Sequence, residues 1–274
     1  MRYGLSVPNF GAFADPHAFV QLATAAEAGG WDGVYIWDHI VVADGMDVAD
    51  PWVCLAAAAA VTERVRLGPL VTPLPRRYPW SVAREVTTLD RLSGGRITLG
   101  VGIGNPPEEE FGTFGLPTNA RTRADLLDEA LEVIEGMWTG EPFSYAGQHY
   151  VVKETRFGPG PVQRPRPPIW VAGAWPARRP FRRAARFDGV FPLKRGDDGR
   201  ELVPLGADDL AGVVAYVGEH RDTDEAFDVI ITDVDAPDAP IAELADIGVT
   251  WMLSYLFAFD DAAQAMVAAG PTRV

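Results

Sequence analysis

The fold is best predicted from the stretch Thr88-Leu-Asp-Arg-Leu-Ser-Gly-Gly-Arg-Ile-Thr-Leu-Gly-Val-Gly-Ile-Gly104. It contains the end of an expected helix from Pro79 to Leu92 and an expected strand from Arg96 to Gly102. Three glycines at spacing two close the strand, and glycine lets backbone approach a flat ring or a phosphate closely. This is not the GxGxxG dinucleotide fingerprint, because Pro106 and Pro107 intervene before any helix.

The same alternation of a short apolar run and an amphipathic segment extends in both directions. Further strands are expected at Tyr3–Pro8, Gly33–Asp38, Val65–Val71, Ile169–Gly173, Gly189–Pro192, Phe227–Thr232 and Val249–Tyr255. Further helices are expected at Pro16–Ala28, Pro51–Thr62, Arg121–Trp138, Ala177–Arg186, Asp208–His220, Ile241–Asp246 and Asp261–Ala269. A hairpin at Glu141–Val152, with its turn near Ala146–Gly147, interrupts the alternation.

Eight such units in 274 residues predict an α/β fold, with a single (βα)8 TIM barrel domain over residues 1–274. A complete barrel typically needs ~250 residues, and strands alternating with helices imply parallel pairing with right-handed crossovers. Residues 105–120 and 141–168 exceed the repeat, and we expect them to be loop insertions at the C-terminal face of the barrel. An open doubly wound sheet is the alternative, because the strand at Gly189–Pro192 is short.

Composition argues against several classes of partner and site. The formal net charge of −14 makes nucleic acid and anionic membranes unsuitable partners. No run approaches the ~18 apolar residues of a membrane helix, and the first residues lack a signal-peptide pattern, so we expect a cytoplasmic protein. A single cysteine, Cys54, excludes an internal disulfide. No residues have metal-ligand spacing, so we expect no metal, and Glu108–Glu110 is expected to be a solvated loop or a helix start.

In a (βα)8 barrel, ligands are held by the loops that follow the strands. His39 closes an otherwise apolar strand directly beyond Trp37 and Asp38, where an imidazole can exchange a proton near neutral pH. A partly buried histidine with a structural role is the alternative. The other polar residues or glycines expected in these loops are Asn9, Thr72, Gly102, Gly104, Asn105, Gly173, Lys194, Arg195, Asp233 and Tyr255.

A phosphate site is expected where Gly173-Ala-Trp-Pro176 joins a strand to a helix. Free amides at a helix start, together with the helix dipole, favour an anion. Arg178 and Arg179 lie in the first turn, where a basic residue is unfavourable unless an anion is bound. The arginine clusters are also compatible with ordinary solvated helix faces.

Two motifs carry a family resemblance. Gly33-Val-Tyr-Ile-Trp-Asp-His39 and the Thr88–Gly104 stretch resemble the bacterial-luciferase-like oxidoreductases, which use a flavin or the deazaflavin coenzyme F420. Arg121-Thr-Arg, with the helix that follows it, and Pro168-Ile-Trp-Val-Ala-Gly173 match as well. The resemblance implies a (βα)8 barrel, usually a homodimer, that binds coenzyme F420 or FMN across the barrel mouth and acts on a small-molecule substrate.

The resemblance also implies roles for individual residues. His39 and Asp38 would be catalytic, and a non-prolyl cis peptide would lie behind the ring at Pro69–Leu70. The implied cofactor contacts are Pro69, Leu70, Thr72, Val101, Gly102, Gly104, Asn105, Gly173, Ala174 and Trp175. The expected walls of the substrate pocket are Asn9, Phe10, Trp37 and Trp52. Several deazaflavin members carry an acidic residue where this chain has Asn105.

Three functions are compatible with these residues. The first is F420-dependent hydride transfer to or from a small organic substrate, with His39 moving the accompanying proton. The second is FMN-dependent monooxygenation, in which a dry pocket protects reduced flavin that activates O₂. The third belongs to another class: a catalytically inactive barrel that only binds a ligand. A glycosidase is disfavoured, because Asp38 and Asp233 are the only obvious carboxylate pair.

Overall fold

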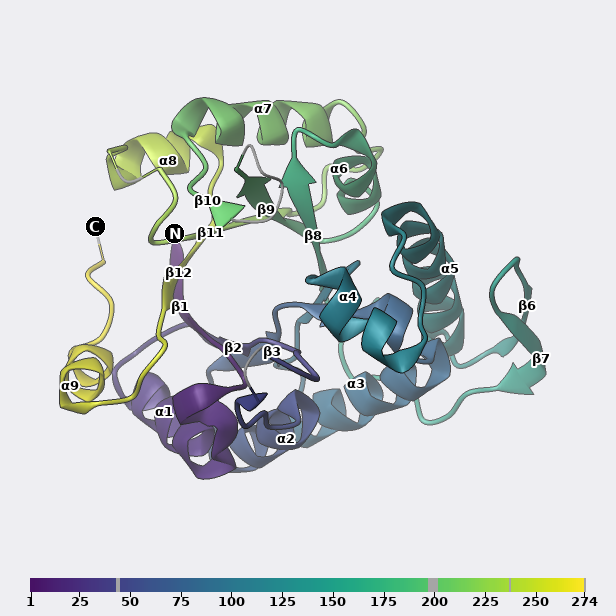
Figure 1. Cartoon of the computed structure of the whole chain (residues 1–274), viewed down its shortest axis with the longest axis horizontal. Coiled ribbons are helices and arrows are strands. Elements are labelled where there is room, and N and C mark those ends of the chain that lie inside the picture. The colour runs from purple at the N-terminus through teal and green to yellow at the C-terminus, as the bar shows by residue number, and fades with distance from the viewer. Residues whose placement is uncertain (43–44, 197–201, 237, 274) are drawn as a thin grey trace.

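The computed structural model describes residues 1–42, 45–196, 202–236 and 238–273. A ring of parallel strands is surrounded by helices (Figure 1). The strands of the ring are β1 (Arg2–Val7), β2 (Gly33–Ile36), β3 (Arg66–Pro69), β4 (Thr72–Pro73), β5 (Leu99–Gly102), β8 (Ile169–Trp175), β9 (Gly189–Arg195), β11 (Asp228–Thr232) and β12 (Trp251–Tyr255). The fold is therefore the expected TIM-type barrel, and the open sheet is wrong.

The helices lie outside the ring, as the alternation of the sequence predicts (Figure 1). They are α1 (Pro16–Ala28), α2 (Pro51–Val61), α3 (Pro79–Ser93), α4 (Pro107–Glu110), α5 (Ala120–Trp138), α6 (Arg178–Ala184), α7 (Ala207–Gly218), α8 (Ile241–Ile247) and α9 (Asp261–Ala269). Short 3-10 helices are η1 (Gly11–Ala14), η3 (Leu74–Arg76) and η4 (Gly112–Phe114). Within the described residues, no helix combines the length and apolarity that crossing a bilayer requires.

Side-chain caps fix where several helices begin. The carboxylate of Asp50 accepts hydrogen bonds from the backbone N–H groups of Trp52 (2.9 Å) and Val53 (3.0 Å) at the start of α2. The side chain of Asn119 does the same for the first turn of α5. These bonds satisfy N–H groups that have no partner within the helix, so each strand-to-helix loop ends at a defined residue.

The ring closes between β3 and the chain that leads into β5. The N–H of Leu67 donates to the carbonyl of Arg96 (3.1 Å), and the N–H of Thr98 donates to the carbonyl of Leu67 (2.9 Å). Farther along, Thr72 of β4 pairs with Val101 of β5. β3 and β4 are therefore successive parts of one strand position, and the described part of the chain has eight positions around the ring.

The cis peptide lies between these two parts, at Leu70–Val71. The expected position, Pro69–Leu70, is wrong by one bond. The reason is the ladder with β2: Pro69 pairs with Ile36, and the N–H of Leu70 still donates to the carbonyl of Ile36 (2.8 Å). The pairing with β2 ends at Leu70, and the irregular bond follows that residue.

Large aromatic side chains fill the inside of the ring. Tyr35, Trp170 and Trp251 are buried, with ring centroids 5.1 to 5.8 Å apart. Burial raises the pKa of the Tyr35 hydroxyl, which keeps it neutral. Because these rings occupy the barrel interior, a ligand has room only at its two ends.

The two expected insertions contain structure of their own. Residues 105–120 include α4 and η4, and the second insertion contains the hairpin β6 (Pro142–Ala146) and β7 (Val151–Arg156), which projects beyond α5 (Figure 1). The turn of the hairpin lies next to Ala146–Gly147, as expected, because β6 ends at Ala146 and the N–H of Gly147 donates to the carbonyl of Tyr150 (2.9 Å). The carboxylate of Glu129 on α5 accepts hydrogen bonds from three successive N–H groups, at residues 148–150, and holds the turn there. A short strand, β10 (Leu202–Val203), pairs antiparallel with β9.

Candidate active site

A cavity of about 630 Å³ opens at the carboxyl ends of the strands. Twelve of the residues expected at the site line it: Trp37, Asp38, His39, Leu70, Gly102, Gly104, Asn105, Gly173, Ala174, Lys194, Arg195 and Tyr255. The other expected residues lie outside its lining: Asn9, Phe10, Trp52, Pro69, Thr72, Val101, Trp175 and Asp233. Most of this second group is buried behind the cavity wall, where it supports the residues in front.

Asp38 is the centre of a buried charge cluster. Its carboxylate accepts hydrogen bonds from the hydroxyl of Thr72 (2.8 Å), from Arg76 (2.9 Å) and from Arg77 (2.9 Å). Two guanidinium groups next to one carboxylate offset the cost of burying its charge. With both oxygens engaged in this way, the carboxylate of Asp38 joins the end of β2 to Thr72, Arg76 and Arg77. The guanidinium of Arg77 also lies 5.7 Å from the ring centroid of Trp52, behind the cavity.

His39 is held at both its backbone and its ring. The side-chain amide of Asn9 donates to the carbonyl of His39 (2.8 Å) and accepts from its N–H (3.1 Å). The Nδ1 atom of the ring lies 3.0 Å from Oε1 of Glu110, and Phe10 and Trp37 pack beside the ring. The side chain is 24% exposed, so the imidazole contacts both protein and cavity.

Glu110 is the residue that the sequence interpretation missed. The side chain is 1% exposed, so a solvated loop is wrong for this residue, although its neighbours Glu108 and Glu109 are exposed. A usable signal was Phe111, since a large apolar residue directly after three glutamates is expected to be buried and to draw Glu110 inward. The helix start itself is confirmed, because α4 begins at Pro107.

Glycines shape the wall between β5 and β8. A Cβ atom at Gly102 would lie 3.0 Å from a methyl carbon of Val71 and 3.7 Å from the Cβ of Ala172. Gly104 has φ +80°, and a Cβ atom there would lie 2.6 Å from the ring of Phe111. Glycine is thus needed at Gly104 by conformation and by space, and at Gly102 it keeps the cavity open.

One side of the cavity is cationic. Arg179, Arg183, Lys194 and Arg195, which come from α6 and β9, are part of its lining. Lys194 contacts Asp209 (2.6 Å), Arg179 contacts Asp125 (2.5 Å), and Arg195 donates to the side chain of Asn105 (3.2 Å). Lys194 and Arg195 reach the rim through the extension of β9 beyond the expected strand.

The expected phosphate cradle is only partly formed. Gly173 and Ala174 line the cavity, but β8 continues to Trp175, and α6 begins at Arg178. Arg178 packs against two aromatic rings, with its guanidinium carbon 4.4 Å from the centroid of Trp175 and 4.6 Å from that of Tyr216. Its position in the first turn is explained by these rings and therefore does not indicate an anion.

The opposite side of the cavity is aromatic. The ring of Trp37 makes edge contacts with Tyr255 and Phe257, each with a centroid distance of 5.7 Å. Burial, together with the charges of Asp235 and Asp233, raises the pKa of the Tyr255 hydroxyl, so it stays neutral. Tyr255 was expected in a loop at the site. Phe257 was not expected there, because the position of Phe257 depends on the loop after β12.

The position of β2 opposite β9 sets the geometry of the whole cavity. Around the ring, β2 is separated from β9 by β1, β12 and β11 on one side and by the β3–β4 position, β5 and β8 on the other. His39 follows β2, and Lys194 and Arg195 end β9. A ligand that touches both must therefore span the barrel mouth.

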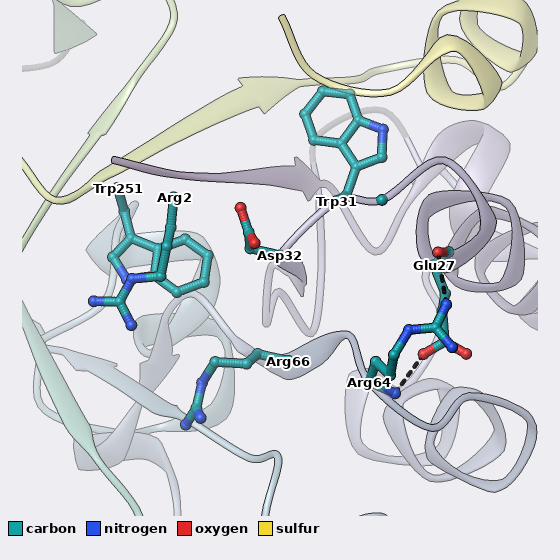
Figure 2. A pocket seen from close by; sticks show the side chains of 8 residues that line it. Arg2, Glu27, Trp31, Asp32, Arg64, Arg66 and Trp251 are labelled. Carbon is teal, nitrogen blue, oxygen red and sulfur yellow. Dashed lines mark hydrogen bonds between the residues drawn. The ribbon is translucent and has the colours of Figure 1, made fainter. Parts of the chain in front are cut away.

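A second cavity, of about 380 Å³, lies at the amino ends of the strands. Figure 2 shows Arg2, Asp32, Arg66 and Trp251 around it. The charged groups are paired with the protein itself: Arg2 with Asp228, Asp32 with Arg273, and Arg66 with the hydroxyl of Thr98 and the side chain of Gln163. Such internal pairing is typical of a structural barrel floor. Among the described residues, no group of three or more His, Cys, Asp or Glu side chains could hold a metal ion.

Comparison with known proteins adds to this geometry. The family described as luciferase-like monooxygenase matches residues 1–205. An F420-dependent glucose-6-phosphate dehydrogenase of Beutenbergia cavernae is 35% identical over 195 residues, which are 68% of this chain and 55% of that protein.

Two solved structures share the fold. An F420-dependent secondary alcohol dehydrogenase, in complex with an F420–acetone adduct, superposes with a TM-score of 0.79 at 16% identity and covers 98% of this chain and 96% of its own. The oxygenating constituent of 3,6-diketocamphane monooxygenase from Pseudomonas putida, in complex with FMN, has a TM-score of 0.64 at 22% identity and covers 85% of this chain and 66% of its own.

Proposed function

The chain belongs to the luciferase-like monooxygenase family, and we propose that its barrel binds coenzyme F420 across the mouth and transfers a hydride to or from a small organic substrate. The observation that carries this proposal is the position of His39 opposite Lys194 and Arg195 across one cavity. An elongated cofactor with a flat ring and an anionic tail fits that arrangement.

The donor set of the cavity suits such a cofactor. Gly102 leaves space beside the wall for a planar ring, and Leu70 and Val71 provide apolar contacts below it. Lys194 and Arg195 supply positive charge for an acidic tail at the rim, near the backbone of Gly173 and Ala174, whereas Arg179 is paired with Asp125 and Asp128.

The chemistry is then divided between cofactor and protein. When bound, the deazaflavin ring supplies a carbon that accepts or gives a hydride. His39 holds or releases the accompanying proton at Nε2, because its other ring nitrogen is engaged by Glu110. Trp37, Tyr255 and Phe257 keep water out and favour an apolar or cyclic substrate.

Monooxygenation with FMN is the second candidate, favoured by the same apolar wall and by the FMN-bound neighbour. Titration of the purified protein with each cofactor tests both candidates, with tryptophan emission as the signal. Micromolar binding of F420 that is tighter than binding of FMN supports the proposal. FMN binding without F420 binding overturns it, and binding of neither supports an inactive ligand-binding barrel.

We further propose a homodimer that is formed through the outer face of α2. This helix is apolar all round: Val53 and Val61 are 63% and 54% exposed, and alanines lie between them. Next to it, Tyr78 and Trp80 stack on each other and are partly exposed. A helix without a polar face is usually buried, so a second copy is the expected cover. Sedimentation velocity at micromolar concentration tests this, and a monomer would contradict it.

A further inference from the structure

Glu110 is buried next to His39 and shares Arg76 with Asp38. Oε2 of Glu110 lies 3.4 Å from Arg76, but that arginine donates its closer hydrogen bonds to Asp38, at 2.6 Å to the carbonyl and 2.9 Å to the carboxylate. The shortest contact of Glu110 is the one with Nδ1 of His39, at 3.0 Å. A carboxylate that is 1% exposed is thus directed at the candidate catalytic imidazole.

The carboxylate acts as an acceptor at this position. The N–H of Ile40 donates to Oε1 (3.2 Å) and Oε2 (3.4 Å), and Arg76 lies on the same side. Because the N–H groups of Ile40 and Arg76 already supply hydrogens to this carboxylate, it is the acceptor in its contact with His39 too. The hydrogen of that contact must therefore be on Nδ1 of the ring. In a neutral imidazole, a hydrogen on Nδ1 leaves the lone pair on Nε2.

Charged side chains from several elements lie around the ring. The groups that face His39 are Glu110 from α4, Arg76 from η3, and Asp38 with its partner Arg77, which also contacts Glu85 (3.8 Å); the side chains that pack directly on the ring, Phe10 and Trp37, are uncharged. Of these groups, Glu110 is the one that the structure places within hydrogen-bond distance of a ring nitrogen, so the tautomer depends on it.

We propose that Glu110 is a positioning residue that fixes His39 in the tautomer with hydrogen on Nδ1, so that Nε2 exchanges a proton with a ligand in the cavity. Asn9 clamps the backbone of His39 on the other side, so the ring is held in both position and tautomer. The same logic orients the histidine of a catalytic triad. The role of Nε2 rests on the proposed function, but the tautomer does not.

The tautomer can be measured in the protein without cofactor. Protein with ¹⁵N-labelled histidine, recorded by long-range ¹H–¹⁵N correlation near pH 8, should show a protonated Nδ1 and an unprotonated Nε2 for His39. In Glu110→Gln, the side-chain amide can donate to Nδ1, so a population with hydrogen on Nε2 should appear. Glu109→Gln is the matched control, because Glu109 is exposed on the same helix, and its spectrum should equal that of the wild type.

Each outcome decides the inference. Hydrogen on Nε2 in the wild type overturns it, as does an unchanged tautomer in Glu110→Gln. If Glu110→Gln does not fold, Glu110→Asp keeps a charged acceptor at greater distance and should show the wild-type tautomer in a reduced fraction. A full wild-type fraction in that variant would also contradict the role.

The kinetic consequence is a separate test. With a substrate that is turned over, kcat of Glu110→Gln should fall by ~10²-fold, within the range that a positioned acid–base group contributes, while KM and cofactor affinity change less than about twofold. Failure of cofactor binding in the wild type would overturn the proposed function and leave the tautomer result standing. An altered tautomer with unchanged kcat would show that Glu110 orients a histidine that is not catalytic.

Discussion

The hydroxyl of Thr72 donates a 2.8 Å hydrogen bond to the carboxylate of Asp38, and both side chains are buried. This bond joins the start of β4 to Asp38, which lies two residues after the end of β2, one strand position away. It engages Oδ2 of Asp38, while Oδ1 accepts from Arg76 and Arg77. Thr72 therefore lies behind the cavity wall, where it stabilises the charge cluster of Asp38, Arg76 and Arg77 next to His39.

Thr72→Val should lower the free energy of unfolding by about 1.5–3 kcal/mol, the range for a hydrogen bond to a charged group. Valine keeps the shape of threonine, so the loss reports the missing hydroxyl. Urea unfolding at pH 7 measures the effect. Thr88→Val is the control, because the Thr88 hydroxyl bonds only to an exposed helical carbonyl and its loss should cost little.

His39→Ala should fold like the wild type and bind cofactor, but lose turnover by about 10²–10⁴-fold, the contribution of a general acid–base group. The side chain is partly exposed and packs only at its edges, so its removal opens no large void. Circular dichroism, cofactor titration and steady-state rates give the three readouts. Unchanged turnover would remove His39 from the mechanism.

Gly102→Val should abolish cofactor binding while the barrel still forms. The added Cβ would already stand 3.0 Å from Val71, and the two further methyl groups would have to enter the cavity. Gly218→Val is a suitable comparison, because a Cβ there meets nothing within 4 Å. Wild-type affinity in the Gly102 variant would show that the ring lies elsewhere.

Lys194→Ala should weaken F420 binding by about tenfold, equivalent to ~1.4 kcal/mol, and should reduce the dependence of affinity on salt. Lys194 lies at the cavity rim and is 38% exposed, so its charge is accessible to an acidic tail. Lys153 is the only other lysine of the chain and lies on β7, which makes Lys153→Ala the matched control. Equal losses in both variants would argue against a specific tail site.

Asp128 should make stability depend on pH below neutrality. Burial acts to raise the pKa of this carboxyl, but hydrogen bonds and charge from Arg183 and Arg179 outweigh it, so the pKa lies below its ordinary value of 3.8. A lowered folded-state pKa stabilises the fold above the ordinary value, and that contribution disappears as pH falls through the folded-state pKa.

The Asp128→Asn variant tests this sign. Wild type should be more stable than Asp128→Asn at pH 7, and the gap should shrink once the pH falls below about 4. Thermal melts between pH 7 and 3 measure it, with the exposed Asp224→Asn as reference. A gap that grows on acidification would contradict the assignment.

Most of the architecture could be predicted from the sequence because it depends on local periodicity. The spans of α1 and α9 agree with prediction to the residue, and β8 and β9 differ only by extending farther. The predicted strand ends were less accurate, since the observed ends depend on hydrogen bonds with neighbouring strands. The cis bond after Leu70 shows this, because it lies where the pairing with β2 ends.

The site could be predicted only as far as strand ends determine it. His39 and Gly102 follow from the alternation, because every strand delivers its last residue to the same face. Phe257 belongs to a loop whose folding depends on tertiary contacts, and no local pattern places it at the cavity. Glu110 lies in α4, and although Phe111 indicates that Glu110 is buried, its contact with His39 depends on how α4 packs. Trp52 was expected in the substrate pocket because it is aromatic, yet it is buried behind Arg77.

The aromatic layer formed by Tyr35, Trp170 and Trp251 separates two tasks within one barrel. At the amino ends of the strands, the paired charges around the second cavity contribute to stability. At the carboxyl ends, the loops form the candidate ligand site. Loops at the carboxyl ends of the strands can therefore be exchanged or lengthened without disturbing the aromatic layer or the ion pairs at the amino ends. This suits the scaffold to directed evolution toward new substrates, with mutations confined to the loops after β5, β9 and β12.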